Sequence, residues 1–206
     1  MPPPEKKVFK SLMYSVLGGL LVASMIFVIL LVRAEDSEHF LTTNATQRSF
    51  LHLADTATLV TERGSITIKF EKDLAPNAVA NFIKLADRGF YDDTIFHRVI
   101  SGGVIQGGDP TGEGDGGPGY SLIPEVSEKN IKRGLVVMAR DGKRLSGSQF
   151  IIVSAKRVPD LDGTQTIFAE VTSGMDIVDS ISRARTDEND KPYSDITLYR
   201  VNLSGN

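Results

Sequence analysis

The stretch "HRVISGGVIQGGDPTGEGDGGPGY", residues 97–120, carries more structural information than any other part of this chain. Nine of its 24 residues are glycine, and one arginine and one glutamine stand among apolar residues. Glycine adopts positive φ angles and lets other backbone approach closely. The stretch therefore predicts sharply bent loops around short strands, with Arg98 and Gln106 held at defined positions.

A phosphate-binding loop is the first alternative for so many glycines. Gly112, Gly114 and Gly117 match the pattern G-x-G-x-x-G. A dinucleotide site needs a helix N-terminus directly after such a loop, whereas "PGYSLIPEV" follows here with two prolines. Glu113 and Asp115 would also repel phosphate. The pattern indicates an irregular loop and not a nucleotide site.

The flanking sequence predicts a mainly β domain with two helices. Residues 56–70 form two β-branched runs around "ERG", which is typical of a hairpin. Residues 75–90 predict a helix, with Pro76 in its first turn and Gly89 at its end. Further short strands and a second helix at 174–184 follow. Together they favour an antiparallel barrel or sandwich capped by helices.

Alternation along three predicted strands brings polar side chains to one face. Successive residues of a strand point to opposite sides, so Arg98 points away from His97, and Val104 and Gln106 share a side. Gln149 and Ile151 share a side in "SQFIIV". If these strands are neighbours, one face carries an arginine and two glutamines beside apolar residues. Spacing alone leaves two interpretations open, a binding groove or an ordinary solvated face.

Residue types exclude several other chemistries. The chain has no cysteine, and His97 lies inside a predicted strand without a nucleophile motif nearby, so we interpret it as a structural histidine. No cluster of His, Asp and Glu has metal-ligand spacing. We expect neither a metal nor a cofactor.

The blocks "FHRVI", "VIQGGDPTGEGDGGPGY", "GLVVMA", "GSQFII" and "LDGTQTIFAEV" resemble the cyclophilin family of peptidyl-prolyl cis–trans isomerases. The likeness runs from about Thr58 to Leu203. It implies a closed eight-stranded antiparallel β-barrel capped by two α-helices, which we assign to residues 56–204. It also implies proline-containing polypeptides as clients, and we expect the chain to be a monomer.

The resemblance also implies the roles of individual residues. Arg98 and Gln106 match the family's catalytic arginine and glutamine. An arginine suits the reaction because a guanidinium is always charged and carries several donors. The positions that match the family's peptide-binding residues are Gly103, Val104, Ala139, Gln149, Ile151, Leu161 and Gln165.

The chain departs from the family pattern mainly where aromatic side chains are usual. Gly103 and Ile151 stand where the family usually has phenylalanine, and Val104 where it has methionine. Asp160 occupies the position of a frequent tryptophan that contacts cyclosporin, and Gln165 replaces a histidine. We therefore predict reduced isomerase activity and low cyclosporin affinity. The alternative is a non-catalytic chaperone or scaffold module that binds proline peptides.

The N-terminal segment predicts a membrane anchor. Residues 1–11 are basic. Residues 12–32 carry no charge, and as a helix this segment is long enough to cross a bilayer core of about 30 Å. Residues 33–55 show no clear period and predict a stalk. The positive-inside rule places the N-terminus in the cytoplasm and the domain on the other side. A signal peptide cleaved after Ala34 is the competing interpretation.

Two acceptor sequons, at Asn44 and Asn202, lie on the predicted lumenal side. We expect a single-pass type II protein of the endoplasmic reticulum or Golgi, or of the outer side of the inner membrane in a bacterial host. Residues 35–206 carry 19 Lys and Arg against 25 Asp and Glu. This acidic balance disfavours nucleic acid as a partner.

Overall fold

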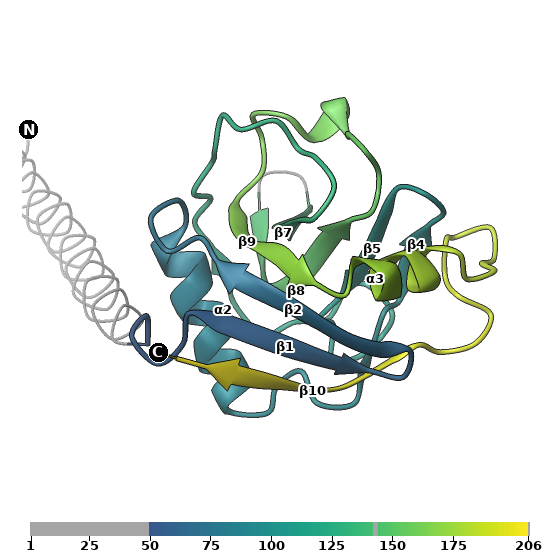
Figure 1. Cartoon of the computed structure of the whole chain (residues 1–206), viewed down its shortest axis with the longest axis horizontal. Helices are drawn as coiled ribbons and strands as arrows, with labels where there is room; N and C mark the ends of the chain where they lie inside the picture. The colour runs from purple at the N-terminus through teal and green to yellow at the C-terminus, as the bar shows by residue number, and fades with distance from the viewer. Residues whose placement is uncertain (1–49, 142–143, 206) are drawn as a thin grey trace, which may run out of the picture. The chain divides into compact units, whose positions relative to one another are not determined.

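The structure is a computed structural model that describes residues 50–141 and 144–205 (Figure 1). The predicted tail 1–11, the membrane span 12–32, most of the stalk and the Asn44 sequon lie outside these residues. Within the described ranges, no helix combines the length and the apolar character that a membrane crossing requires.

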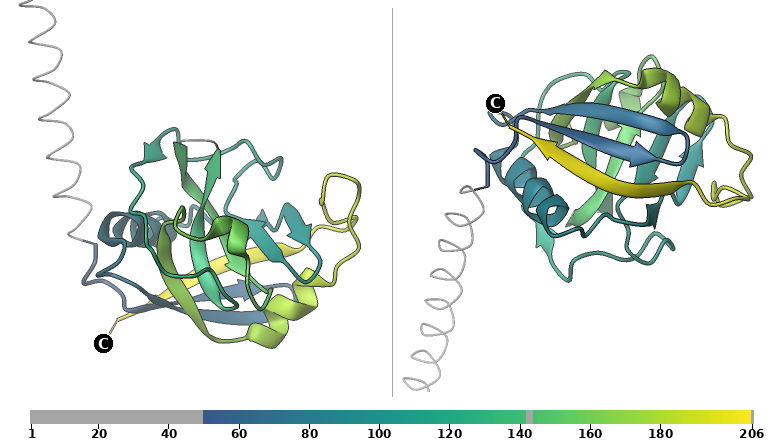
Figure 2. Two further views of the ribbon diagram at one scale, coloured as in Figure 1. Left: turned by 90° about the horizontal axis from the view of Figure 1, so that it is seen from above. Right: turned by 60° about the horizontal axis from the view of Figure 1, so that its bottom comes forward.

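A single curled antiparallel sheet of ten strands forms the body of the domain (Figure 2). Its order is β3-β10-β1-β2-β9-β7-β8-β5-β4, and β6 pairs with β8 off this path. The strands are β1 Thr56–Thr61, β2 Gly64–Phe70, β3 Thr94–Ile95, β4 Arg98–Ile100, β5 Val104–Gly107, β6 Ser121–Leu122, β7 Leu135–Asp141, β8 Arg144–Val153, β9 Ile167–Ser173 and β10 Thr197–Ser204.

The mainly β, antiparallel architecture with two helices is confirmed, but the closed eight-stranded barrel is not. The paired strands leave β3 and β4 at the two edges of the sheet. We expected one strand to carry both His97 and Arg98, yet Phe96 and His97 are consecutive and both buried. Two neighbouring inward side chains break the alternation of a strand. Strand β3 pairs with β10 at one edge of the sheet. After Phe96 and His97 the chain reaches the other edge and continues as β4, which pairs with β5.

Both predicted helices are present. Helix α2 spans Pro76–Asp87 with proline in its first turn, and Gly89 follows it at φ 67°. Helix α3 spans Met175–Ser182 and buries Val178 and Ile181. A short 3-10 helix, η1 at Pro159–Leu161, was not predicted, because three residues carry no readable period.

The main core lies between α2 and the concave side of the sheet. Phe82 of α2 is fully buried, and its ring contacts those of Phe70, Tyr91, Phe150 and Phe168 at centroid distances of 4.8–5.8 Å. Packing starts before the predicted domain start at residue 56, since Ala54 is buried and residues 50 and 51 pack against the core.

A second apolar cluster lies on the opposite face of β5, β7 and β8, because alternate residues of these strands point away from the main core. It supports η1 and the start of β9. Its buried members are Val104, Ile131, Leu135, Val137, Val153 and Ile167, and Ile100, Ile151, Ala155, Val158 and Leu161 pack against them.

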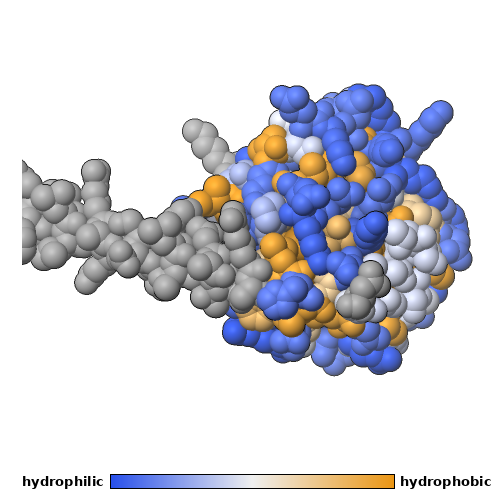
Figure 3. Space-filling model, turned by 60° about the vertical axis from the view of Figure 1, so that its left-hand side comes forward, coloured by the Kyte–Doolittle hydropathy of each residue, from blue (hydrophilic) through white to orange (hydrophobic). Residues whose placement is uncertain are grey.

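The outer surface seen in Figure 3 is mainly hydrophilic, with apolar side chains in small groups.

Candidate functional site

Arg98 and Gln106 lie side by side on neighbouring strands. Arg98 on β4 is directly opposite Gln106 on β5, which in turn is opposite Ile151 on β8. Residues in register on adjacent strands share a face of the sheet. The predicted face is therefore present, with Val104 buried beside it and His97 pointing the other way into the protein.

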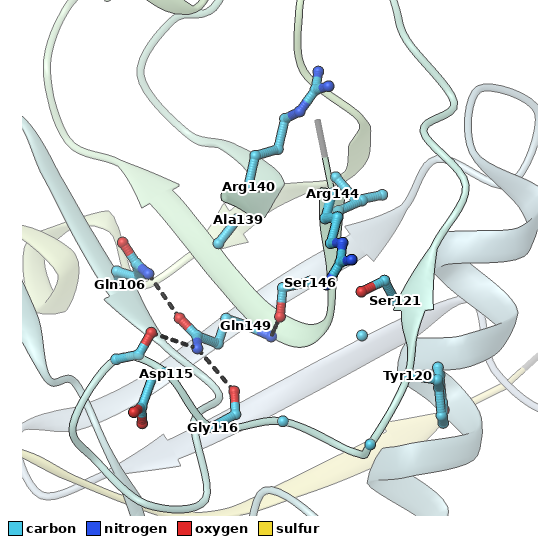
Figure 4. Close-up of a pocket in the computed structure, with 15 residues that line it drawn as sticks. Gln106, Asp115, Gly116, Tyr120, Ser121, Ala139, Arg140, Arg144, Ser146 and Gln149 are labelled. Carbon is cyan, nitrogen blue, oxygen red and sulfur yellow. Dashed lines mark hydrogen bonds between the residues drawn. The ribbon is translucent and has the colours of Figure 1, made fainter. Parts of the chain in front are cut away.

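The two predicted glutamines form one hydrogen-bonded unit (Figure 4). Gln106 Nε2 donates to Gln149 Oε1 at 2.8 Å. Gln149 Nε2 donates to the carbonyl oxygens of Gly114 at 3.0 Å and Gly116 at 2.9 Å. Both carbonyls belong to the glycine-rich loop, residues 108–120, which connects β5 to β6. Because the backbone of this loop fixes the Gln149 amide, that amide fixes the orientation of Gln106.

Asp109 holds the glycine-rich loop in place from inside. Its fully buried carboxylate accepts hydrogen bonds from Thr111 N at 2.7 Å, Thr111 Oγ1 at 2.9 Å, Gly114 N at 2.6 Å and Gly116 N at 3.1 Å. Burial raises the pKa of Asp109, but these hydrogen bonds together bring the pKa below its usual value. The loop thus bends around an anion of the protein itself, which explains its glycines without a bound phosphate.

A cavity of about 600 Å³ adjoins the glutamine pair. The glycine-rich loop, β6, Ala139 on β7 and the start of β8 form its walls (Figure 4). Asn81 of α2 braces it, since its Nδ2 donates to Gly147 O and its Oδ1 accepts from Tyr120 Oη, both at 2.7 Å. Three residues that the sequence predicted as part of the site, Gln106, Ala139 and Gln149, line this cavity. Its other walls were not predicted, because they come from segments that are distant in the sequence.

The predicted proline-binding residues are partly brought together. Val104, Ile151 and Leu161 all belong to the second apolar cluster. Gly103 adds no side chain, and its carbonyl accepts from Ser154 N and Ala155 N at 2.9 Å. Gln165 is more than nine-tenths buried and donates to Thr164 Oγ1 at 3.2 Å, so its amide is not hydrogen-bonded to the glutamine pair.

His97 lies buried beneath the glycine-rich loop. A Cβ on Gly114 would lie 3.6 Å from its ring, and neither ring nitrogen has a hydrogen-bond partner within the described residues. Burial lowers the pKa of His97, opposed by the charge of Asp109. The structure thus places His97 as a core residue whose ring lies close to the glycine-rich loop.

This burial predicts that stability depends on pH. In the unfolded chain His97 binds a proton near pH 6.5, whereas the folded protein resists protonation. The contribution of neutral, buried His97 to the free energy of unfolding is therefore complete above about pH 6.5. It is lost as the pH falls toward the lower pKa that His97 has in the folded protein. We expect the urea midpoint to fall less steeply between about pH 7 and pH 5 in His97→Gln than in the wild type. The exposed His52→Gln is the control, and identical pH profiles for wild type and His97→Gln would contradict the prediction.

Comparison with known proteins identifies the fold and the family. Residues 56–203 match the family model described as "Cyclophilin type peptidyl-prolyl cis-trans isomerase/CLD". The chain belongs to the cyclophilin family. Two of its relatives are peptidyl-prolyl cis-trans isomerase CYP18-1 of Arabidopsis thaliana and cypE of Dictyostelium discoideum. The Arabidopsis protein is 40% identical over 72% of this chain. The Dictyostelium protein is 42% identical over 71% of this chain, and the match covers 96% of each relative.

Other members of the family are longer. The chain is 38% identical to peptidyl-prolyl cis-trans isomerase-like 2 of Rhizopus delemar but spans only 28% of that protein. Among solved structures, a cyclophilin type isomerase of Cryptosporidium parvum superposes with a TM-score of 0.69 at 31% identity, over 74% of this chain and 99% of that one. A second structure of the same Cryptosporidium parvum protein, determined in the presence of the dipeptide Ala-Pro, superposes with a TM-score of 0.68. The resemblance seen in the sequence is confirmed at the level of the family.

Proposed function

We propose that this cyclophilin catalyses cis–trans isomerisation of X–Pro bonds in polypeptides. The observation that carries the proposal is the shared sheet face, where the Arg98 guanidinium and the Gln106 amide lie beside the apolar side chain of Ile151. Rotation about an amide bond meets a barrier of about 18–20 kcal/mol, which comes from resonance of the C–N bond. Lowering it requires no nucleophile and no metal.

The catalytic step follows from what changes during rotation. As the bond twists, the prolyl nitrogen becomes pyramidal and its lone pair can accept a hydrogen bond. Arg98 supplies a charged donor to that nitrogen, while Gln106 holds the carbonyl side of the bond. These interactions exist only in the twisted state, so they accelerate the reaction and do not merely tighten substrate binding. The second apolar cluster seats the proline ring.

We further propose that activity and cyclosporin affinity are reduced. The wall beside Arg98 is aliphatic, formed by Val104 and Ile151, and Gly103 contributes no side chain. A buried phenylalanine side chain contributes about 1.5–3 kcal/mol of transfer free energy. Because about 1.4 kcal/mol corresponds to tenfold in affinity, a missing ring weakens proline binding about tenfold.

The test compares the full chain with Arabidopsis CYP18-1 on the same Ala-Pro peptide. We expect a measurable kcat/KM that is about tenfold lower than that of the relative, because proline binding is weaker. Cyclosporin should inhibit weakly for the same reason. Turnover equal to that of the relative with tight cyclosporin binding would contradict the reduced-activity proposal. Peptide binding without any turnover would support the chaperone or scaffold alternative.

We also propose that residues 12–32 anchor the domain in the membrane of the endoplasmic reticulum or Golgi, with residues 56–204 in the lumen. In a bacterial host, the same topology puts the domain on the outer side of the inner membrane. The exposure of Asn202 on β10 supports its use as a glycosylation site. In eukaryotic cells we expect glycosidase to shift the mass of the full chain, and the shift to disappear in the Asn44→Gln, Asn202→Gln double variant. An unglycosylated domain open to protease from the cytoplasm would contradict this topology.

A further inference from the structure

The polar loop between α3 and β10 is tightly organised. Thr186 and Pro192 form an isolated β-bridge across its base. The carboxylate of Asp187 accepts from Asn189 N at 2.8 Å and Lys191 N at 2.9 Å, and Asp187 N donates to Lys191 O at 2.9 Å. Hydrogen bonds within the loop therefore define its shape.

This loop presents one acidic residue to Arg98. Asp190 Oδ2 lies 3.4 Å from Arg98 Nε. The backbone carbonyl of Asp190 accepts from Val99 N at 2.8 Å, so the loop is attached to β4 next to the arginine. Lys191 forms an ion pair with Glu113 at 3.0 Å, which attaches the same loop to the glycine-rich loop.

Two further observations point to a role in orientation. The side chains of Arg98 and Asp190 are each 42% exposed, and ion pairs at such exposure contribute little to stability. Asp190 also has a φ of 63°, in the left-handed region that aspartate tolerates in turns, and this backbone conformation sets the direction of its side chain. The carboxylate of Asp190 is thus placed beside Arg98 by the contacts of its loop with β4 and with Glu113, and not by the strength of the ion pair itself.

We propose that Asp190 is a positioning residue for catalysis by Arg98. It holds the Nε edge of the guanidinium, so that the terminal nitrogens are presented on the other side to the twisting bond. A planar guanidinium has donors in fixed directions, so fixing one edge fixes the rest. The inference rests on the proposed isomerase function, and it adds a residue that contacts Arg98 and not the client.

The test uses three variants of the full chain. We expect Asp190→Asn to lower kcat/KM for a proline peptide about tenfold, less than the roughly 100-fold that a 1 Å misplacement can cost. Peptide affinity measured by titration should stay within about twofold, because Arg98 acts on the twisted state. Asp190→Glu should recover activity to within about threefold, since it restores the charge. Asp190→Gly should behave like Asp190→Asn, although glycine suits the backbone angle better.

Asp179→Asn is the matched control, because it disrupts the bidentate ion pair with Arg133, at 2.7 Å for both contacts, which involves neither Arg98 nor the glutamine pair. It should leave kcat/KM unchanged. In an Arg98→Ala background, Asp190→Asn should have no further effect on kcat/KM. Wild-type activity in Asp190→Asn, or an equal loss in both backgrounds, would overturn the proposal.

A spectroscopic measurement separates this proposal from the proposed function. The Nε–H resonance of Arg98 should shift in Asp190→Asn and return toward its wild-type position in Asp190→Glu. If the wild type proves to have no isomerase activity, the proposed function fails, while this shift still supports the orientation of Arg98 by Asp190. A resonance that is identical in wild type and Asp190→Asn would overturn the positioning role.

Discussion

Arg98→Ala is expected to lower kcat/KM for a proline peptide by about 100- to 1,000-fold, the range found when one preorganised donor is removed from an active site. The loss should fall on the chemical step, because the donor meets its acceptor only in the twisted bond. The side chain is 42% exposed and takes no part in the main core, so the fold should persist. The measurement is peptide turnover, together with circular dichroism and a urea midpoint.

Two controls make this result specific. Arg98→Lys keeps the charge but not the planar set of donors, and it should recover only part of the activity. Arg200→Ala removes an exposed arginine of β10 and should change nothing. If a folded Arg98→Ala protein kept more than about a third of wild-type turnover, the guanidinium would not be the main catalytic group.

Asp109→Ala should have the largest effect on stability of the changes near the site. It removes an acceptor of four hydrogen bonds from the middle of the glycine-rich loop. Hydrogen bonds to a charged group contribute about 1.5–3 kcal/mol each, but the substitution also removes the cost of burying the charge of Asp109, which offsets part of that sum. We expect a loss of about 3 kcal/mol in the free energy of unfolding, measured with urea.

The same change should also reduce activity. Gly114 and Gly116 donate to Asp109 and accept from Gln149, so a loosened loop releases the amide that orients Gln106. We expect at least a threefold fall in kcat/KM under conditions in which the variant is fully folded. Asp73→Ala, at an exposed carboxylate before α2, is the control for both readouts. Unchanged stability and turnover in Asp109→Ala would show that the loop holds its shape without this anchor.

Local pattern was sufficient for much of the fold. The β-branched runs around "ERG" are β1 and β2, with β2 starting at Gly64, and Pro76 begins α2. Alternation predicted the side of its own strand on which Arg98 and Gln106 each lie, because the side-chain period of a strand is strict. Only the pairing of β4 with β5 shows that the two residues share a face. The same rule failed at Phe96 and His97, where packing in three dimensions buries two neighbours and divides the expected strand.

The rest of the site depends on contacts between distant segments. The anchoring role of Asp109 had a local signal, since an aspartate two residues before a threonine in a glycine-rich stretch is typical of a turn that its own side chain stabilises. Asp190 had none. It lies in an acidic loop that spacing cannot distinguish from solvated sequence, and only the fold brings it next to Arg98.

The crossing at Phe96 and His97 has a mechanical consequence. In the described part of the chain, no strand pairing joins β3 to β4, so these two residues link the opposite margins of the half-barrel along the backbone. Arg98 is the first residue beyond that link. The isolated bridge between Ile95 and Asp109 joins the same margins just beside this link. We therefore expect the position of the guanidinium, and with it the chemistry, to depend on how tightly the sheet is rolled.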